Sequence, residues 1–169
     1  NCLNNKPLYC QKFISLGTTI NGGFADYIVV NKNFLNTGPI IKVNNKIDYK
    51  YSCLAESFAC VINGIESINL KRVNSVLIIG SGYMGLLFII LLKKLYKIKK
   101  IDIIDTNKER LILAKKIWVD NFFNISVSNK NISKILKANK REKYDYVVSA
   151  NNNITCHKAS LKLVNKGGF

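Results

Sequence analysis

Three glycines and one carboxylate have the residue types and spacing of a defined chemistry. Gly80, Gly82 and Gly85 follow the pattern G-x-G-x-x-G, and Asp105 comes twenty residues after the last of them. In such a pattern the first glycine permits a tight turn, the second lets backbone approach a pyrophosphate, and the third lets a helix lie close to a strand. The N-terminus of that helix attracts phosphate, and the carboxylate accepts hydrogen bonds from ribose hydroxyls. These residues predict a dinucleotide site.

The elements around the glycines must position them, and they support this interpretation. Residues 76–79 are apolar and rich in β-branched types, as in a buried parallel strand, and residues 101–105 form a second such run that ends on the carboxylate. Two alternatives compete. One is a membrane span, because the seventeen residues 76–92 carry no charge, although a span needs about 20 apolar residues. The other is a buried strand–helix pair with incidental glycines. The order of strand, turn, helix, strand and acid favours the nucleotide site over both.

The chain beyond Asp105 continues to alternate. The expected elements are helices over 108–117, 132–140 and 154–164, strands over 119–123 and 144–150, and a glycine C-cap at 166–168. This alternation predicts a parallel sheet with right-handed crossovers and helices on both faces. Its ligand crevice is expected at the carboxyl ends of the strands, where residues 80–85, Asp105 and residues 149–152 fall.

The first part of the sequence has a different pattern. Turn signals and short apolar runs predict strands over 24–30 and 40–43, so this part is expected to be rich in β-structure and loops. Asp48 is expected to cap one helix through residue 66, with an apolar stripe along one face. Glu56 lies among apolar residues in this helix. From the residues alone, a solvated or salt-bridged position is favoured for it.

Composition limits the classes of partner. The formal charge is +16, from 23 Lys and 3 Arg that are spread through the chain. This spread indicates a compositional bias more than a nucleic-acid-binding face, which favours clustered Arg and Lys, and the positive field favours anionic ligands. Five cysteines at irregular spacing predict no disulfide framework and a reducing cytoplasm. We expect Cys53, Cys60 and Cys156 to be buried small residues and His157 to be structural.

Several motifs together resemble one known family. The segments are GGFADYIVV at 22–30, LAESFACVING at 54–64, the glycine turn at 80–85, residues 104–111, and KLVNKGG at 162–168. They are similar to those of the zinc-dependent medium-chain dehydrogenases and, within them, the sorbitol/polyol and threonine dehydrogenase branch. The chain starts at Asn1 without a methionine and ends on a glycine turn, so we expect a fragment of a longer enzyme.

The resemblance implies an α/β fold and two kinds of metal site. Residues 56–169 would form a Rossmann-type, NAD-binding domain, preceded over 1–55 by part of a β-rich GroES-like catalytic domain with part of a structural zinc lobe. Cys2 and Cys10 have the separation of that lobe's third and fourth ligands. Glu56 matches a glutamate that ligates or approaches the catalytic zinc. The remaining catalytic ligands, a Cys and a His-Glu pair, are expected before Asn1.

The resemblance also implies the cofactor contacts. The residues expected to bind NAD are Gly80, Gly82, Tyr83, Met84, Gly85, Asp105, Arg110 and Ala150. Asp105 would accept from the adenosine ribose and repel a 2′-phosphate, so NAD is expected over NADP. Three departures from the family pattern stand out: Ser57 and Tyr83 replace frequent prolines, and 151–152 is Asn-Asn.

The implied function is oxidation of a secondary alcohol of a polyol, sugar alcohol or amino-alcohol, with NAD taking the hydride. Zinc would act as a Lewis acid that lowers the pKa of the bound alcohol. The parent protein is expected in the cytoplasm as a dimer or tetramer, without nucleic-acid or membrane partners, and the fragment alone is expected to be inactive. Two alternatives stay open: a non-catalytic dinucleotide-binding or regulatory module, and a zinc-free quinone-reductase-like relative. Cys2, Cys10 and Glu56 argue against both.

Overall fold

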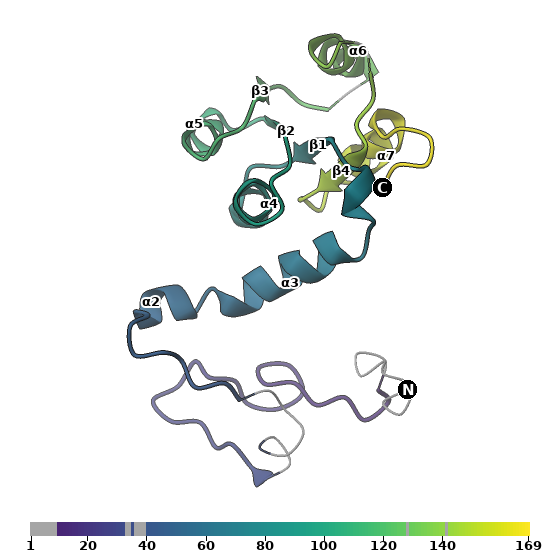
Figure 1. Ribbon diagram of the computed structural model, residues 1–169. Helices are drawn as coiled ribbons and strands as arrows, with labels where there is room; N and C mark the ends of the chain where they lie inside the picture. Colours follow the sequence, from purple (N-terminus) through teal and green to yellow (C-terminus); the bar gives the residue numbers. More distant parts are fainter. Residues whose placement is uncertain (1–9, 33–34, 36–39, 128, 141) are drawn as a thin grey trace. The chain divides into compact units, whose positions relative to one another are not determined.

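The computed structural model describes residues 10–32, 35, 40–127, 129–140 and 142–169 (Figure 1). The chain divides into two compact units, Asn1–Ile47 and Asp48–Phe169. This division falls a few residues before the domain boundary expected from the sequence, which stays a prediction.

The described part of the first unit consists mainly of turns, bends and irregular backbone, with helical conformation at Lys32 and Leu35. Its most regular feature is a turn at residues 15–20, in which the Gly17 N–H donates to the Ile20 carbonyl at 2.9 Å. The strands predicted over 24–30 and 40–43 are wrong for this structure, because neither stretch has strand structure. Phe24 and Tyr27 are almost fully exposed. A strand depends on N–H and C=O partners from a neighbour, and no described residue of this unit pairs with these stretches. The GroES-like assignment therefore stays a prediction.

The second unit begins with two helices where the sequence predicted one. Asp48 caps the first as expected, accepting from the Lys50 N–H at 2.9 Å. Helix α2 spans Tyr49–Ser52 and helix α3 spans Ala55–Glu66. The interruption arises because the Leu54 N–H bonds three residues back, to the Tyr51 carbonyl, which is a 3₁₀-type connection.

The remaining elements alternate as the sequence predicted. They are a 3₁₀ turn η3 (Leu70–Arg72), β1 (Ser75–Ile79), α4 (Tyr83–Lys94), β2 (Lys100–Asp105), α5 (Lys108–Lys116), β3 (Asn121–Asn124), α6 (Asn129–Ala138), β4 (Tyr146–Ser149) and α7 (Ile154–Leu163). The strands form a parallel sheet in the order β3-β2-β1-β4. This arrangement confirms the α/β prediction with helices on both faces.

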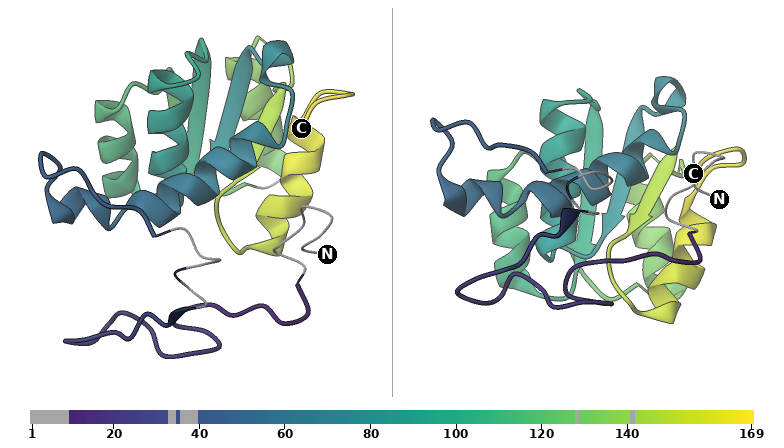
Figure 2. Two further views of the ribbon diagram at one scale, coloured as in Figure 1. Left: turned by 60° about the horizontal axis from the view of Figure 1, so that its bottom comes forward. Right: turned by 90° about the horizontal axis from the view of Figure 1, so that it is seen from below.

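Side chains that alternate along the strands point into two hydrophobic cores, one on each face of the sheet. Val76 and Ile78 face one side of β1, toward the core with α3, α4 and α5, and Leu77 and Ile79 face the other, toward the core with α6 and α7. Figure 1 shows α4 and α5 on one side of the sheet and α6 and α7 on the other, and Figure 2 shows α3 running along the unit, where it packs on α4. Strands covered on both faces are continuously apolar. This explains the uncharged run that suggested a membrane span.

The membrane alternative is not supported by the described helices. The apolar run divides at the glycine turn into β1 and the 12-residue α4, and no helix within the described residues is long and apolar enough to cross a membrane.

Three local expectations were wrong. Cys53 and Cys60 are exposed, not buried. Helix α7 ends at Leu163 and its C-cap residue Val164 is extended. The positive-φ residue Gly167 (φ 73°) lies in the turn that follows rather than in the cap. Strand β3 begins at Asn121, which pairs with Asp102 in parallel register, two residues after the predicted start.

Candidate cofactor site

The fold itself requires the first and third glycines of the turn. Gly80 has φ of 109°, and a Cβ there would lie 2.7 Å from the Ala150 carbonyl oxygen. A Cβ on Gly85 would lie 2.0 Å from the Gly80 carbonyl oxygen, because α4 rests directly on the end of β1. Neither contact is possible for a side chain. The interpretation of these two glycines as incidental is therefore wrong.

Gly82 differs from the other two. It is the N-cap of α4 with φ of −71°, a conformation open to any residue, and a Cβ there would meet only Arg110 Nη1, at 3.8 Å. Packing within the described residues thus does not exclude a side chain at this position. A bare backbone here leaves room in front of the helix N-terminus, where the first N–H groups of a helix have no intrahelical acceptor. This is the geometry that phosphate binding needs.

Asp105 is bonded to the same turn. Its Oδ2 accepts from the Ser81 N–H at 2.6 Å and from the Ser81 hydroxyl at 2.8 Å, and its Oδ1 accepts from the Asn107 N–H at 2.8 Å. Partial burial alone would raise the pKa of Asp105, but the hydrogen bonds from Asn107 and Ser81 and the charge of Arg110 outweigh it and lower the pKa. The carboxylate is therefore ionised at neutral pH, as an acceptor for ribose hydroxyls must be.

A pocket of about 340 Å³ lies at the carboxyl ends of β1, β2 and β4. It is lined by Ile79, Gly80, Ile104, Asp105, Thr106, Ile125, Ser126, Val127, Asn151, Asn153, Thr155 and Cys156. Asn151, one of the two unusual asparagines, closes the loop by donating from Nδ2 to the Ile79 carbonyl at 2.9 Å. The crevice predicted at the strand ends is thus present, and Asp105 is in its wall.

The other expected cofactor residues surround the turn. Ala150 packs against Gly80 and donates its N–H to the Ile79 carbonyl at 2.9 Å. Tyr83 and Met84 are in the first turn of α4 and are 49% and 37% exposed. Arg110 is exposed in the first turn of α5. The structure brings these residues together with the glycines and Asp105, and their role in binding stays a prediction.

Sequence reasoning missed Ser81. Its side chain is fully buried, and it ties the glycine turn to the end of β2. The available signal was a hydroxyl residue directly after the first glycine of a motif whose acid comes from the next strand. Only the closeness of the two strand ends makes that signal meaningful.

The expected metal ligands do not converge in the described residues. Cys2 lies outside them. Cys10 is half-buried in the first unit, and Glu56 is exposed in the first turn of α3, so its apolar neighbours do not shield it from water there. No group of three His, Cys, Asp or Glu side chains within the described part of the chain could hold a metal ion. The zinc assignments therefore stay predictions.

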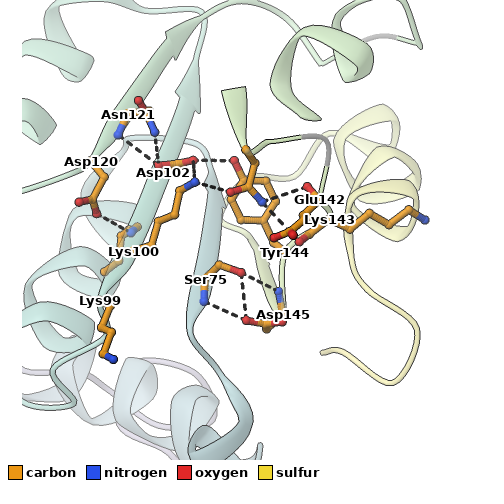
Figure 3. Close-up of polar contacts among 12 residues, drawn as sticks. Ser75, Lys99, Lys100, Asp102, Asp120, Asn121, Glu142, Lys143, Tyr144 and Asp145 are labelled. Carbon is orange, nitrogen blue, oxygen red and sulfur yellow. Dashed lines mark hydrogen bonds and ion pairs between the residues drawn. The ribbon is translucent and has the colours of Figure 1, made fainter. Parts of the chain in front are cut away.

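A second polar cluster, also missed, lies toward the amino ends of the strands (Figure 3). Asp102 is fully buried, and its Oδ2 accepts from the Tyr144 hydroxyl at 2.6 Å. Its Oδ1 accepts from the Asn121 N–H and Nδ2, at 3.1 and 2.9 Å. Lys100 Nζ lies 3.9 Å from Oδ2 and also donates to Asn139. None of these residues lines the pocket, so the cluster is structural.

The parallel sheet and the turn at its carboxyl edge place the second unit among nucleotide-binding domains of the Rossmann type. No known family profile matches the chain. It is 27% identical to D-arabinitol dehydrogenase 1 of Uromyces fabae, over 99% of this chain and 46% of that protein. It is 28% identical to D-altritol 5-dehydrogenase of Agrobacterium fabrum, over 99% of this chain and 47% of that protein.

Structural comparison agrees. An alcohol dehydrogenase, RspB of Escherichia coli in complex with NADH, superimposes with a TM-score of 0.81 at 25% identity, over 99% of this chain and 47% of that one. The homologues of this chain are polyol and alcohol dehydrogenases of the zinc-dependent medium-chain family, which confirms the resemblance seen in the motifs. The chain spans about half the length of these relatives.

Proposed function

We propose that this chain binds NAD and serves a dehydrogenase that transfers a hydride from a secondary alcohol to the cofactor. One observation carries the proposal: of the three glycines in the turn, only Gly82 lacks a packing reason, and it directly follows Ser81, which donates to Asp105. The relatives named for D-arabinitol and D-altritol support a polyol or sugar alcohol as substrate, and a relative named L-threonine 3-dehydrogenase supports an amino-alcohol.

The residues of the turn fit the cofactor. The N-terminus of α4, left bare by Gly82, would receive the pyrophosphate, and Asp105 would accept from the adenosine ribose. The net charge of +16 would favour an anionic ligand. When bound, NAD supplies the hydride acceptor, and the protein's part is to bind and orient it.

Zinc is proposed from the family resemblance alone. Cys2 and Cys10 would contribute to a structural site and Glu56 to a catalytic site, where zinc supplies a Lewis acid. The described donors do not form a metal site by themselves. Zinc per chain, measured by mass spectrometry, should fall in Cys10→Ser. In the full-length enzyme, Glu56→Gln should lower zinc retention or turnover and leave the NAD affinity nearly unchanged. Full zinc and full turnover in both variants would contradict the proposed ligands.

Location and assembly complete the proposal. The absence of a disulfide-type cysteine pattern favours a reducing cytoplasm, and the family resemblance favours a dimer or tetramer without nucleic-acid or membrane partners.

The central test is cofactor binding followed by turnover. NAD titrated into the protein by calorimetry should bind, and Gly82→Val should abolish binding by filling the space before α4. Gly23→Val is a matched control, because nothing lies within 4 Å of a Cβ there. D-arabinitol, D-altritol and an amino-alcohol should then be assayed by NADH absorbance with the longer enzyme of which this chain is expected to be a fragment. No NAD binding would overturn the proposal, and binding without turnover of any secondary alcohol would favour a non-catalytic module.

A further inference from the structure

The two ends of β1 carry the same hydrogen-bonding device. At the amino end, the N–H and the hydroxyl of Ser75 both donate to Oδ2 of Asp145, each at 3.0 Å (Figure 3). Just past the carboxyl end, the N–H and the hydroxyl of Ser81 both donate to Oδ2 of Asp105, at 2.6 and 2.8 Å. Each device ties β1 to the chain of a neighbouring strand. Only the Ser81 device adjoins the candidate cofactor site.

The Ser81 device limits what Asp105 can do. A carboxylate has about four acceptor positions, two on each oxygen. Ser81 occupies both positions on Oδ2, and Asn107 occupies one on Oδ1. One acceptor position on Oδ1 therefore stays open for a ligand. Since the Ser81 side chain is fully buried, water does not compete for its hydroxyl, and the carboxylate is held against rotation.

Arg110 is a cation close to this arrangement. Its Nη1 lies 3.8 Å from the Cβ position of Gly82, and its charge lowers the pKa of Asp105. A guanidinium in this position is also a partner for a 2′-phosphate. If the carboxylate could rotate away, Arg110 would be free to bind that phosphate. A carboxylate held in place keeps its negative charge at the site, where it repels the phosphate.

We propose that Ser81 is a positioning residue that sets the preference of this site for NAD over NADP, by fixing Asp105 with a single open acceptor position. The inference rests on the proposed cofactor binding and goes beyond it. Asp105 supplies the negative charge, and Ser81 holds the carboxylate in one position.

The test compares dissociation constants of Ser81→Ala for NAD and NADP, measured by calorimetry. Loss of one hydrogen bond to a charged group should weaken NAD binding by about tenfold. NADP binding should weaken by no more than about twofold or should improve, so the ratio of the NADP to the NAD dissociation constant should narrow by about fivefold or more. Ser81→Cys, which keeps the size but is a weak donor, should narrow the ratio in the same direction and covers the case in which Ser81→Ala does not fold.

Ser75→Ala is the matched control, because it removes the corresponding serine hydroxyl at the opposite end of β1. It should lower stability while leaving the ratio of the NAD and NADP constants unchanged. An unchanged ratio in both Ser81 variants would overturn the inference and leave cofactor binding intact. An equal change in Ser75→Ala would overturn it too, as a general effect of loosening β1. A wild-type protein that binds neither nucleotide would refute the proposed function itself.

Discussion

The hydroxyl of Tyr144 donates to Oδ2 of the buried Asp102 at 2.6 Å, joining two strands that are not neighbours in the sheet. Asp102 is in β2, Tyr144 lies two residues before β4, and β1 lies between those strands. A buried carboxylate without partners is costly, so Tyr144, with Asn121 and Lys100, makes this residue tolerable in the core. The cluster fixes the amino half of the sheet, opposite to the candidate cofactor site.

Tyr144→Phe should destabilise the protein by about 1.5–3 kcal/mol, because a buried charged acceptor loses a hydrogen-bond donor. The free energy of unfolding from urea denaturation measures this. Tyr49→Phe is the control, since Tyr49 is 82% exposed, and it should change stability by less than about 0.5 kcal/mol. Similar values for the two variants would show that the Asp102 contact contributes little.

Stability should also depend on Tyr144 at alkaline pH. Burial, followed by the hydrogen bond to Asp102 and the charge of that residue, raises the pKa of Tyr144. The folded state thus holds the proton after the unfolded state, with a tyrosine pKa near ~10, has lost it. The contribution of Tyr144 is complete below about pH 10 and is lost as the pH rises toward the raised pKa.

The expected signature is a comparison of two pH profiles. Above about pH 10 the free energy of unfolding of the wild type should fall relative to that of Tyr144→Phe by about 1.4 kcal/mol per pH unit. Parallel profiles would mean that Tyr144 ionises as easily in the folded protein as in the unfolded chain.

The glycines of the turn should separate into two classes. Gly85→Ala places a methyl group 2.0 Å from a carbonyl oxygen, so it should cost about 3 kcal/mol or more and reduce binding as a consequence. Gly82→Ala meets no backbone, so it should cost about 1 kcal/mol or less, the usual loss at an N-cap, yet weaken NAD binding by about tenfold, as expected when a methyl group stands in a phosphate site. Thermal melting and calorimetry on both variants measure the two effects. If Gly82→Ala instead lost as much stability as Gly85→Ala, the loss of binding would follow from the loss of stability. All three glycines would then serve packing.

Asp105 should give the site its preference for NAD. Its ionised carboxylate repels a 2′-phosphate, so the dissociation constant for NADP should exceed that for NAD by at least about tenfold. Asp105→Ser removes the charge and should narrow the difference. The net positive charge of the protein attracts both nucleotides, so it does not reverse the preference for NAD over NADP. Equal or tighter binding of NADP by the wild type would refute the assignment.

The sequence by itself determined the alternation of strands and helices and the place of the crevice. Parallel strands buried on both faces must be apolar throughout, and the glycine spacing marks the turn between β1 and α4, so residues 76–79, Gly80, Gly85 and Asp105 could be located from local patterns. The strands predicted at 24–30 and 40–43 failed because an apolar run becomes a strand only beside a partner strand, and local sequence does not contain that partner.

Only the tertiary structure decided which polar groups meet. Ser81 and Asp105 are separated by 24 residues and Asp102 and Tyr144 by 42, and these pairs exist because the sheet order sets strand ends side by side. The three glycines belong to one spacing pattern, but the folded chain treats them differently. The Ala150 carbonyl requires glycine at Gly80 and the Gly80 carbonyl requires glycine at Gly85, whereas there is space for a Cβ at Gly82. Residue type supplies the capacity for a hydrogen bond or a close contact, and only the folded chain brings the second group within reach.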